Sequence, residues 1–162
     1  SAGVGKKEVM GSAQDTFISS TMWTERVGFV AGLATLNKLT KCNVSEHLVK
    51  IGTHIGDGWS ELAKKHSLDV FITEYKPLVS FKLNYGKDNN AIETLFIQEM
   101  LKKGYLASTS VYVTYAHTIE IANKYLEGVD EVFKILSDAI KKDKVSDLLE
   151  TEVRTDMFKR LN

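Results

Sequence analysis

The segment SSTMWTERVGF, residues 19–29, combines side chains that could bind an anion. Hydroxyl-bearing residues surround a Met-Trp pair, and an acid and a base then open a run of small and apolar residues. If a helix begins near Thr24, the unpaired N–H groups of its first turn point back toward Thr21 and Ser20, where the helix dipole adds positive potential. A phosphate is favoured there. Because any capped helix offers the same groups, the segment alone predicts either a phosphate site or an ordinary helix cap.

The histidines are weaker candidates for chemistry. His47 and His54 share one face of an expected helix, but no Cys, Asp or Glu completes a metal site at convincing spacing. His66 and His117 stand at the ends of expected elements, where structural roles are more common than catalytic ones. Residues 56–58, Gly-Asp-Gly, lie inside a helical pattern and therefore do not form a phosphate-binding loop. No Ser-His-Asp arrangement follows from the spacing, so we predict no metal ligand and no catalytic residue in this chain.

The amino-acid composition limits the kinds of partner that the chain could bind. The chain has 162 residues, with 43% hydrophobic and 26% charged residues, which is typical of one globular domain. Basic and acidic residues balance at 21 each, so nothing directs the chain toward nucleic acid or an anionic membrane. Cys42 is the single cysteine, which excludes an internal disulfide and suits a reducing, cytoplasmic compartment. No apolar run approaches the length of a membrane span, and no signal peptide is visible.

Hydrophobic periodicity predicts helices in the first part of the chain. A short helix is expected over residues 6–14, between short strand ends at residues 2–5 and 16–20. Apolar residues then recur at helical spacing from Thr24 to about Lys41. Asn43 with Glu46 fits a capping box for a second helix, whose apolar stripe includes Trp59 and continues to His66. We expect Trp59 to be a core residue.

The second part of the chain alternates between strand and helix patterns. A strand is expected over the run at residues 70–73, and two more at residues 79–85 and 111–115, where apolar and polar residues alternate. One helix is expected to begin at Asn90 and to stop at Gly104, and another to begin at Thr118 and to continue to Ile140. A weaker apolar pattern over residues 141–162 predicts one or two short helices. The fold class is therefore α+β, with a small antiparallel sheet and helices on one face.

Three blocks of sequence carry a resemblance to a known family. FISSTMWTERVGFVAGLATL, NVSEHLVKIG and GYLASTSVYVTYAHT resemble class III pyridoxal-phosphate aminotransferases, and among these the members similar to glutamate-1-semialdehyde aminomutase. The likeness covers about residues 1–140. It implies pyridoxal 5'-phosphate (PLP) as the cofactor of the parent protein, an amino donor and a carbonyl acceptor as substrates, and a homodimer whose site is shared across the interface. It also implies that Thr21, with Ser20, binds the PLP phosphate.

The resemblance implies a domain organisation as well. Family members have a large domain with a mostly parallel sheet and a small domain with an antiparallel sheet. Residues 1–23 would be a remnant of the large domain, residues 24–42 a connecting helix, and residues 43–162 the C-terminal small domain of a fold-type I PLP enzyme. The Schiff-base lysine would precede the strand at residues 2–5, and Lys6 and Lys7 do not match it.

Two functions of different classes remain open. The parent protein is expected to be an aminotransferase or aminomutase, and the chain alone is expected to be inactive without the Schiff-base lysine. The alternative is a non-catalytic binding or dimerisation module that stands alone. An upstream lysine about ten residues before Ser1 would favour the first function.

Overall fold

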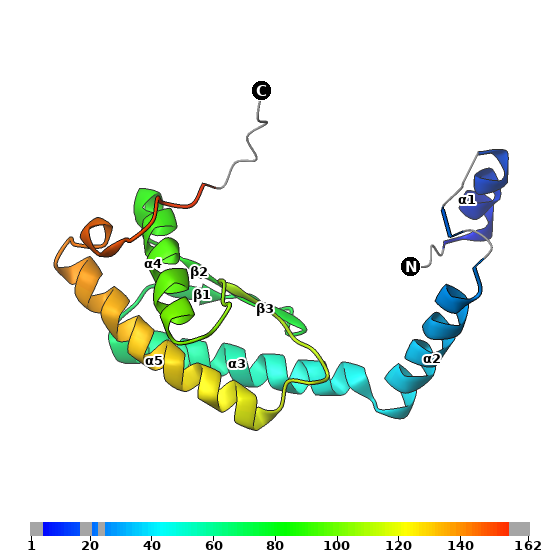
Figure 1. Ribbon diagram of the computed structural model, residues 1–162, viewed down its shortest axis with the longest axis horizontal. Helices are drawn as coiled ribbons and strands as arrows, with labels where there is room; N and C mark the ends of the chain where they lie inside the picture. Colours follow the sequence, from blue (N-terminus) through cyan, green and yellow to red (C-terminus); the bar gives the residue numbers. More distant parts are fainter. Residues whose placement is uncertain (1–4, 17–20, 23–24, 156–162) are drawn as a thin grey trace. The chain divides into compact units, whose positions relative to one another are not determined.

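The computed structural model describes residues 5–16, 21–22 and 25–155, with the side chain of Gln14 left aside. The chain divides into two compact units, Ser1–Val44 and Ser45–Asn162. The expected strand ends at residues 2–5 and 16–20 lie almost entirely outside the described residues. Figure 1 labels the helices and strands of both units.

The first unit contains three described helical segments. The helix expected over residues 6–14 is present as α1 (Lys7–Gly11), which a 3₁₀ turn, η1 (Ser12–Asp15), extends. The longer helix α2 (Val27–Lys41) begins three residues later than predicted, so the expected start at Thr24 is wrong. Before the helix, the Glu25 N–H donates to the Met22 carbonyl oxygen at 3.2 Å.

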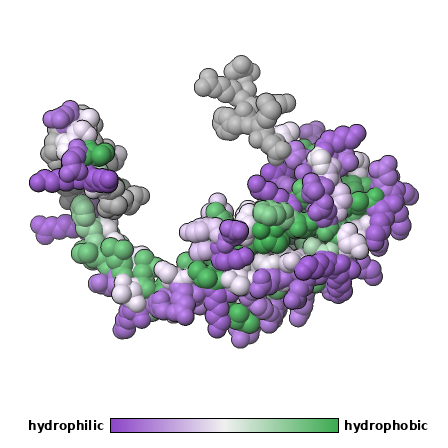
Figure 2. All heavy atoms as spheres, turned by 180° about the vertical axis from the view of Figure 1, so that it is seen from behind, coloured by the Kyte–Doolittle hydropathy of each residue, from purple (hydrophilic) through white to green (hydrophobic). Residues whose placement is uncertain are grey.

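Helix α2 exposes large apolar side chains along its length. Its described residues include no buried one, and Figure 2 shows hydrophobic residues gathered on it. Five large apolar side chains of this helix are 61–70% exposed: Val27, Phe29, Val30, Leu33 and Leu36. Residues 27–36 of the helix include Thr35 as their single polar side chain, so this part lacks the polar face that a surface helix normally presents to water. In the described part of the chain, no helix combines the length and apolarity needed to cross a membrane.

The second unit is an α+β layer structure. Its sheet has the order β1-β2-β3 and is antiparallel throughout, with strands β1 (Val70–Ile72), β2 (Leu78–Leu83) and β3 (Ser110–Tyr112). Helices α3 (Val44–His66), α4 (Asn89–Lys102) and α5 (Ile119–Lys141) supply the other layer. The predicted fold class is confirmed.

Phe81 of the central strand is the point where the three helices meet the sheet. Its ring lies 5.0 Å from that of Trp59 on α3, 5.1 Å from that of Phe96 on α4 and 5.8 Å from that of Phe133 on α5, with near-perpendicular planes. Aromatic rings favour this edge-to-face geometry. The predicted alternation in β2 is confirmed, since Val79, Phe81 and Leu83 are buried. The core is therefore an aromatic cluster between the sheet and three helices.

Glycines allow α3 to pack closely against its neighbours. A Cβ at Gly58 would stand 2.5 Å from a methyl carbon of Leu126 on α5. The Gly-Asp-Gly segment at residues 56–58 therefore serves close packing inside a helix, which agrees with the sequence-based rejection of a phosphate loop.

Some predicted helix ends are confirmed and others are wrong. Thr118 caps α5, because its Oγ1 accepts the Ile121 N–H at 3.3 Å. Gly104 follows the end of α4 in the left-handed region, with φ of 86°. The predicted cap at Asn90 is wrong, because a 3₁₀ turn, η2 (Gly86–Asp88), runs directly into α4 and makes Asp88 the N-cap.

The C-terminal segment differs most from the sequence prediction. Only the 3₁₀ turn η3 (Ser146–Leu148) is helical between the end of α5 and residue 155. After this turn the main chain bonds to side chains of α4. Gln98 accepts the Glu150 N–H at 2.7 Å and donates to the Leu148 carbonyl at 2.9 Å, and Thr94 accepts the Arg154 N–H at 3.0 Å. The weak apolar pattern therefore reflects a segment that lies along α4.

Candidate functional site

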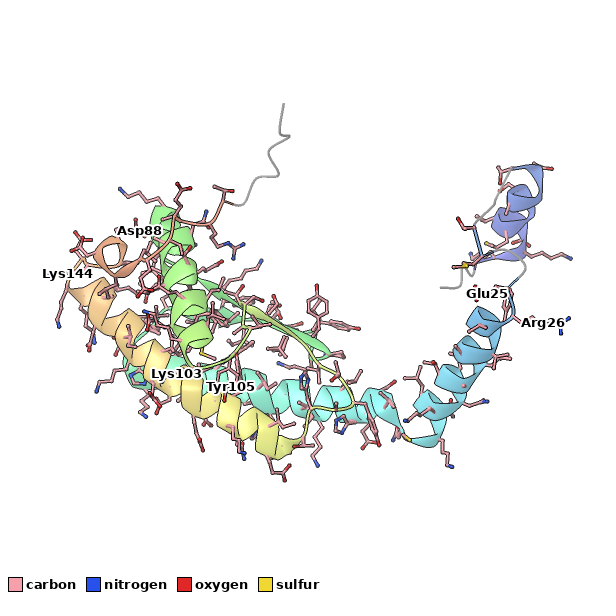
Figure 3. The ribbon with its side chains drawn as sticks, viewed as in Figure 1. Glu25, Arg26, Asp88, Lys103, Tyr105 and Lys144 are labelled. Carbon is pink, nitrogen blue, oxygen red and sulfur yellow. The ribbon has the colours of Figure 1, made fainter. Side chains whose placement is uncertain are left out.

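The predicted phosphate site lies in the first unit. Ser20 is outside the described residues, and Thr21 is an exposed residue in a turn. Figure 3 labels Glu25 and Arg26 at the entry to α2. Arg26 is the N-cap and provides no side-chain hydrogen bond to the first turn. Arg26 therefore leaves the N–H groups that a phosphate would use without a bond from its own side chain, and residues 22–25 separate these groups from Thr21 along the chain.

The histidine pair on α3 does not converge on a metal. His47 Nε2 lies 2.9 Å from the His117 carbonyl oxygen, and His54 Nε2 lies 2.6 Å from the Asn123 side-chain oxygen. The His47 ring therefore links α3 to the segment just before α5, and the His54 ring links α3 to α5. Among the described residues, no group of three or more His, Cys, Asp or Glu side chains is arranged to hold a metal ion.

His66 also has a structural role. Its Nε2 lies 2.6 Å from Asp130 on α5, and the neighbouring Lys65 ammonium donates to the same carboxylate at 2.6 and 2.8 Å. Hydrogen bonds from Lys65, and then from His66, hold the pKa of the Asp130 carboxyl below its ordinary value. The cluster fastens the C-terminal end of α3 to α5.

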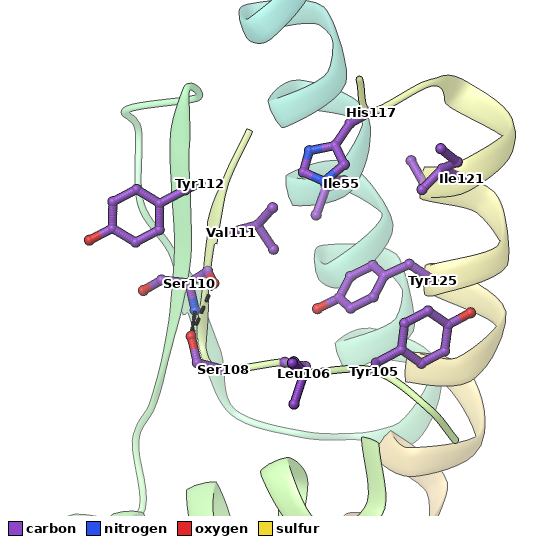
Figure 4. A pocket seen from close by; sticks show the side chains of 12 residues that line it. Ile55, Tyr105, Leu106, Ser108, Ser110, Val111, Tyr112, His117, Ile121 and Tyr125 are labelled. Atoms are coloured by element: carbon purple, nitrogen blue, oxygen red, sulfur yellow. Dashed lines mark hydrogen bonds between the residues drawn. The ribbon is translucent and has the colours of Figure 1, made fainter. Parts of the chain in front are cut away.

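A pocket in the second unit was missed by sequence reasoning. It has a volume of about 390 Å³ and lies between α3, α5 and the segment that contains β3 (Figure 4). Its lining contains no Asp, Glu, Lys or Arg and consists of Ile55, residues 105–108 and 110–112, His117, Ile121, Ala122 and Tyr125. The repeated tyrosines near residues 105–125 were the available signal, but the periodicity assigned Tyr125 to the core stripe of its helix.

Two buried polar groups beside this pocket have no hydrogen-bond partner in the described structure. They are the Tyr125 hydroxyl and the Trp59 indole N–H, whose rings lie 6.2 Å apart. Burial raises the pKa of the Tyr125 phenol, and the nearby Trp59 indole opposes part of that rise. The indole therefore faces the phenol without the geometry of a full hydrogen bond. The phenol stays protonated and can donate.

Comparisons with known proteins relate the chain to part of larger enzymes. No family model matches it. The chain is 23% identical over 137 residues to 2'-deamino-2'-hydroxyneamine transaminase of Streptomyces kanamyceticus, which covers 82% of this chain and 34% of that protein. In structure it is similar to FumI of Sphingopyxis sp. MTA144, solved in its PLP internal aldimine form, with a TM-score of 0.74 and 19% identity over 85% of this chain and 34% of FumI. The chain thus spans about a third of the length of these relatives, and its fold is that of the corresponding part of FumI.

Proposed function

We propose that the chain is the C-terminal part of a PLP-dependent aminotransferase or aminomutase, of the class III group similar to glutamate-1-semialdehyde aminomutase. The observation that carries the proposal is the sequence similarity to a transaminase over 137 residues, together with the shared fold. In this proposal residues 1–23 belong to the large domain, residues 24–42 connect the domains, and residues 43–162 are the small domain.

The cofactor contact is assigned to Thr21, with Ser20 beside it. A hydroxyl and uncapped helical N–H groups are donors of the kind that a phosphate accepts. The exposed Thr21 fits that role, and so does the start of α2, where the N-cap residue Arg26 makes no side-chain hydrogen bond to the first turn. PLP would supply an electron sink for amino transfer, and the protein would supply binding and orientation.

The partners follow from the same family resemblance. The substrates would be a small amino donor and a carbonyl acceptor, in a cytoplasmic homodimer with Thr21 reaching the site of the neighbouring subunit. Mixed dimers test this arrangement. Parent subunits that lack the Schiff-base lysine are exchanged with subunits that carry Thr21→Val, and one intact site per mixed dimer should restore activity. If subunit exchange is verified and no activity returns, the shared site is rejected.

Amino transfer by the parent protein tests the proposal as a whole. The parent is incubated with PLP, pyruvate and a panel of primary amines, and alanine is measured together with the carbonyl product of the amine. The amine is oxidised and pyruvate is reduced, so both products should appear in equal amounts. A parent that binds no PLP and forms neither product contradicts the proposal.

A non-catalytic binding or dimerisation module is the second candidate. The exposed apolar side chains of α2 favour it, because such a surface is commonly covered by a partner. A parent without a lysine upstream of Ser1 would favour this function over catalysis.

A further inference from the structure

We propose that the pocket between α3, α5 and β3 binds a small, uncharged aromatic molecule that carries a hydrogen-bond acceptor. This site is separate from the predicted phosphate contact at Thr21 and does not depend on the proposed aminotransferase function. Three properties of the pocket carry the inference: its lack of charge, its unpartnered donor and its aromatic walls.

The lining of the pocket selects against charged ligands. Its volume of about 390 Å³ is within the range of small-molecule sites. No carboxylate, ammonium or guanidinium group lines the pocket. An ionised ligand would lose its hydration here without a fixed opposite charge in return. The favoured ligand is therefore neutral.

The unpartnered groups define what the ligand must offer. The Tyr125 hydroxyl points inward among the lining side chains in Figure 4, and neither it nor the Trp59 indole has a hydrogen-bond partner in the described structure. Trp59 has no exposed surface, so bulk water does not reach it. A protonated phenol is a donor, and a carbonyl or ether oxygen on the ligand would satisfy it.

His117 supplies a second donor at the pocket. Its Nδ1 accepts the Thr114 N–H at 3.0 Å, so the neutral ring carries its hydrogen on Nε2. His117 is half-buried and lines the pocket. Two neutral donors again favour a ligand with acceptor atoms.

The walls of the pocket favour a flat aromatic ring. The rings of Tyr105 and Tyr125 lie 5.8 Å apart at 81°, and both residues line the pocket. Ring edges and faces in this arrangement interact well with a further aromatic ring. Leu106 is 97% exposed and lines the same pocket, which leaves apolar surface that a bound ring could cover.

Three probe molecules test the inference on the 162-residue chain. Acetophenone has a ring and an acceptor, ethylbenzene has the same shape without the acceptor, and benzoate is charged. The nuclear magnetic resonance signals of the Trp59 indole N–H and the Val111 methyl groups report binding. Acetophenone should shift both signals saturably and bind about 2- to 12-fold more tightly than ethylbenzene, as expected for one neutral hydrogen bond, and benzoate should bind more weakly.

Matched variants connect binding to the named groups. Tyr125→Phe should reduce the affinity for acetophenone to that for ethylbenzene. Tyr75→Phe is the control and should change neither affinity, because Tyr75 is 68% exposed and does not line the pocket. Ala107→Trp should fill the pocket and abolish binding of both probes, with thermal unfolding used to verify that each variant is folded.

Two results would overturn the proposal. One is the absence of saturable binding by acetophenone to the folded chain, which would mean that water alone satisfies the Tyr125 hydroxyl. The other is equal affinity of acetophenone for the original chain and for Tyr125→Phe, which would reduce the pocket to a nonspecific apolar surface.

Discussion

Gly52 of α3 lies directly against the main chain of Lys76, so that a Cβ at residue 52 would stand 1.9 Å from the Lys76 carbonyl oxygen. Backbone atoms cannot move aside as a flexible side chain does. Gly52→Ala should therefore force the segment before β2 away from α3 and lower the free energy of unfolding by about 1–3 kcal/mol or more. Urea unfolding followed by circular dichroism measures the change.

Gly56→Ala is the matched comparison for this prediction. A Cβ there would meet methyl carbons of Val79 and Ile72 at 3.1 and 3.3 Å, which can give by a few tenths of an ångström. Alanine also gains about 1 kcal/mol of helix propensity over glycine. The decrease in the free energy of unfolding should be clearly smaller for Gly56→Ala than for Gly52→Ala. Equal decreases for the two variants would show that residue 52 does not lie close to the main chain of Lys76.

Trp59→Ala should cost about 3–5 kcal/mol, because it leaves a cavity in the aromatic cluster around Phe81. Trp59 has no exposed surface. Phe71→Ala is the control, since Phe71 is 62% exposed on β1 and its loss should change stability little. Unchanged thermal stability of Trp59→Ala would contradict the assignment of this face of α3 to the core.

Asp130→Asn should reduce stability at pH 7, and the difference from the original chain should shrink in acid. The folded pKa of Asp130 lies below its ordinary value of 3.8, first because Lys65 and then because His66 bonds to it. A depressed pKa contributes stability that is present above the unfolded pKa and is lost as the pH falls through the folded pKa. Unfolding free energies of both proteins between pH 2 and 7 measure the effect.

Asp138→Asn controls for a general effect of charge on α5. Asp138 is exposed and makes no ion pair within the described part of the chain. Its replacement should leave the acid dependence nearly unchanged. If Asp130→Asn and Asp138→Asn behave alike, the bonds from Lys65 and His66 do not set the pH dependence.

The 162-residue chain should form no specific covalent adduct with PLP. By the family resemblance, none of its lysines matches the Schiff-base position. After mixing with PLP and reduction with borohydride, mass spectrometry should find only low, scattered labelling of surface lysines. Stoichiometric labelling of one lysine would contradict this prediction, and the parent protein, labelled at a lysine upstream of Ser1, is the positive control.

Local patterns predicted the elements whose formation depends on nearby residues. The apolar stripe of α3, the alternation in β2 and the Thr118 cap of α5 are each properties of a few neighbouring residues, and all three are confirmed. The predicted start of α2 was wrong because apolar spacing does not reveal local bonds such as that from the Glu25 N–H to the Met22 carbonyl oxygen.

Tertiary contacts decided what the sequence could not predict. The segment after η3 forms no helix up to residue 155, because Gln98 and Thr94, about fifty to sixty residues earlier, bond to its main chain. The pocket depends on the angle between α3, α5 and β3, which no local pattern encodes. Tyr125 fits the predicted core stripe of its helix. The structure adds that its ring packs against that of Trp59 and that its buried hydroxyl has no hydrogen-bond partner among the described residues.

The affinity of the parent protein for PLP tests the central claim most directly. The Thr21 hydroxyl would donate to a charged phosphate, a bond worth about 1.5–3 kcal/mol, so Thr21→Val should weaken PLP binding roughly 10- to 150-fold. Thr35→Val is the matched control, because the Thr35 hydroxyl donates to the Ala31 carbonyl within α2 at 2.8 Å and should not affect PLP. Equal PLP dissociation constants for the original parent and both variants would contradict the account and leave residues 19–29 as an ordinary helix entry.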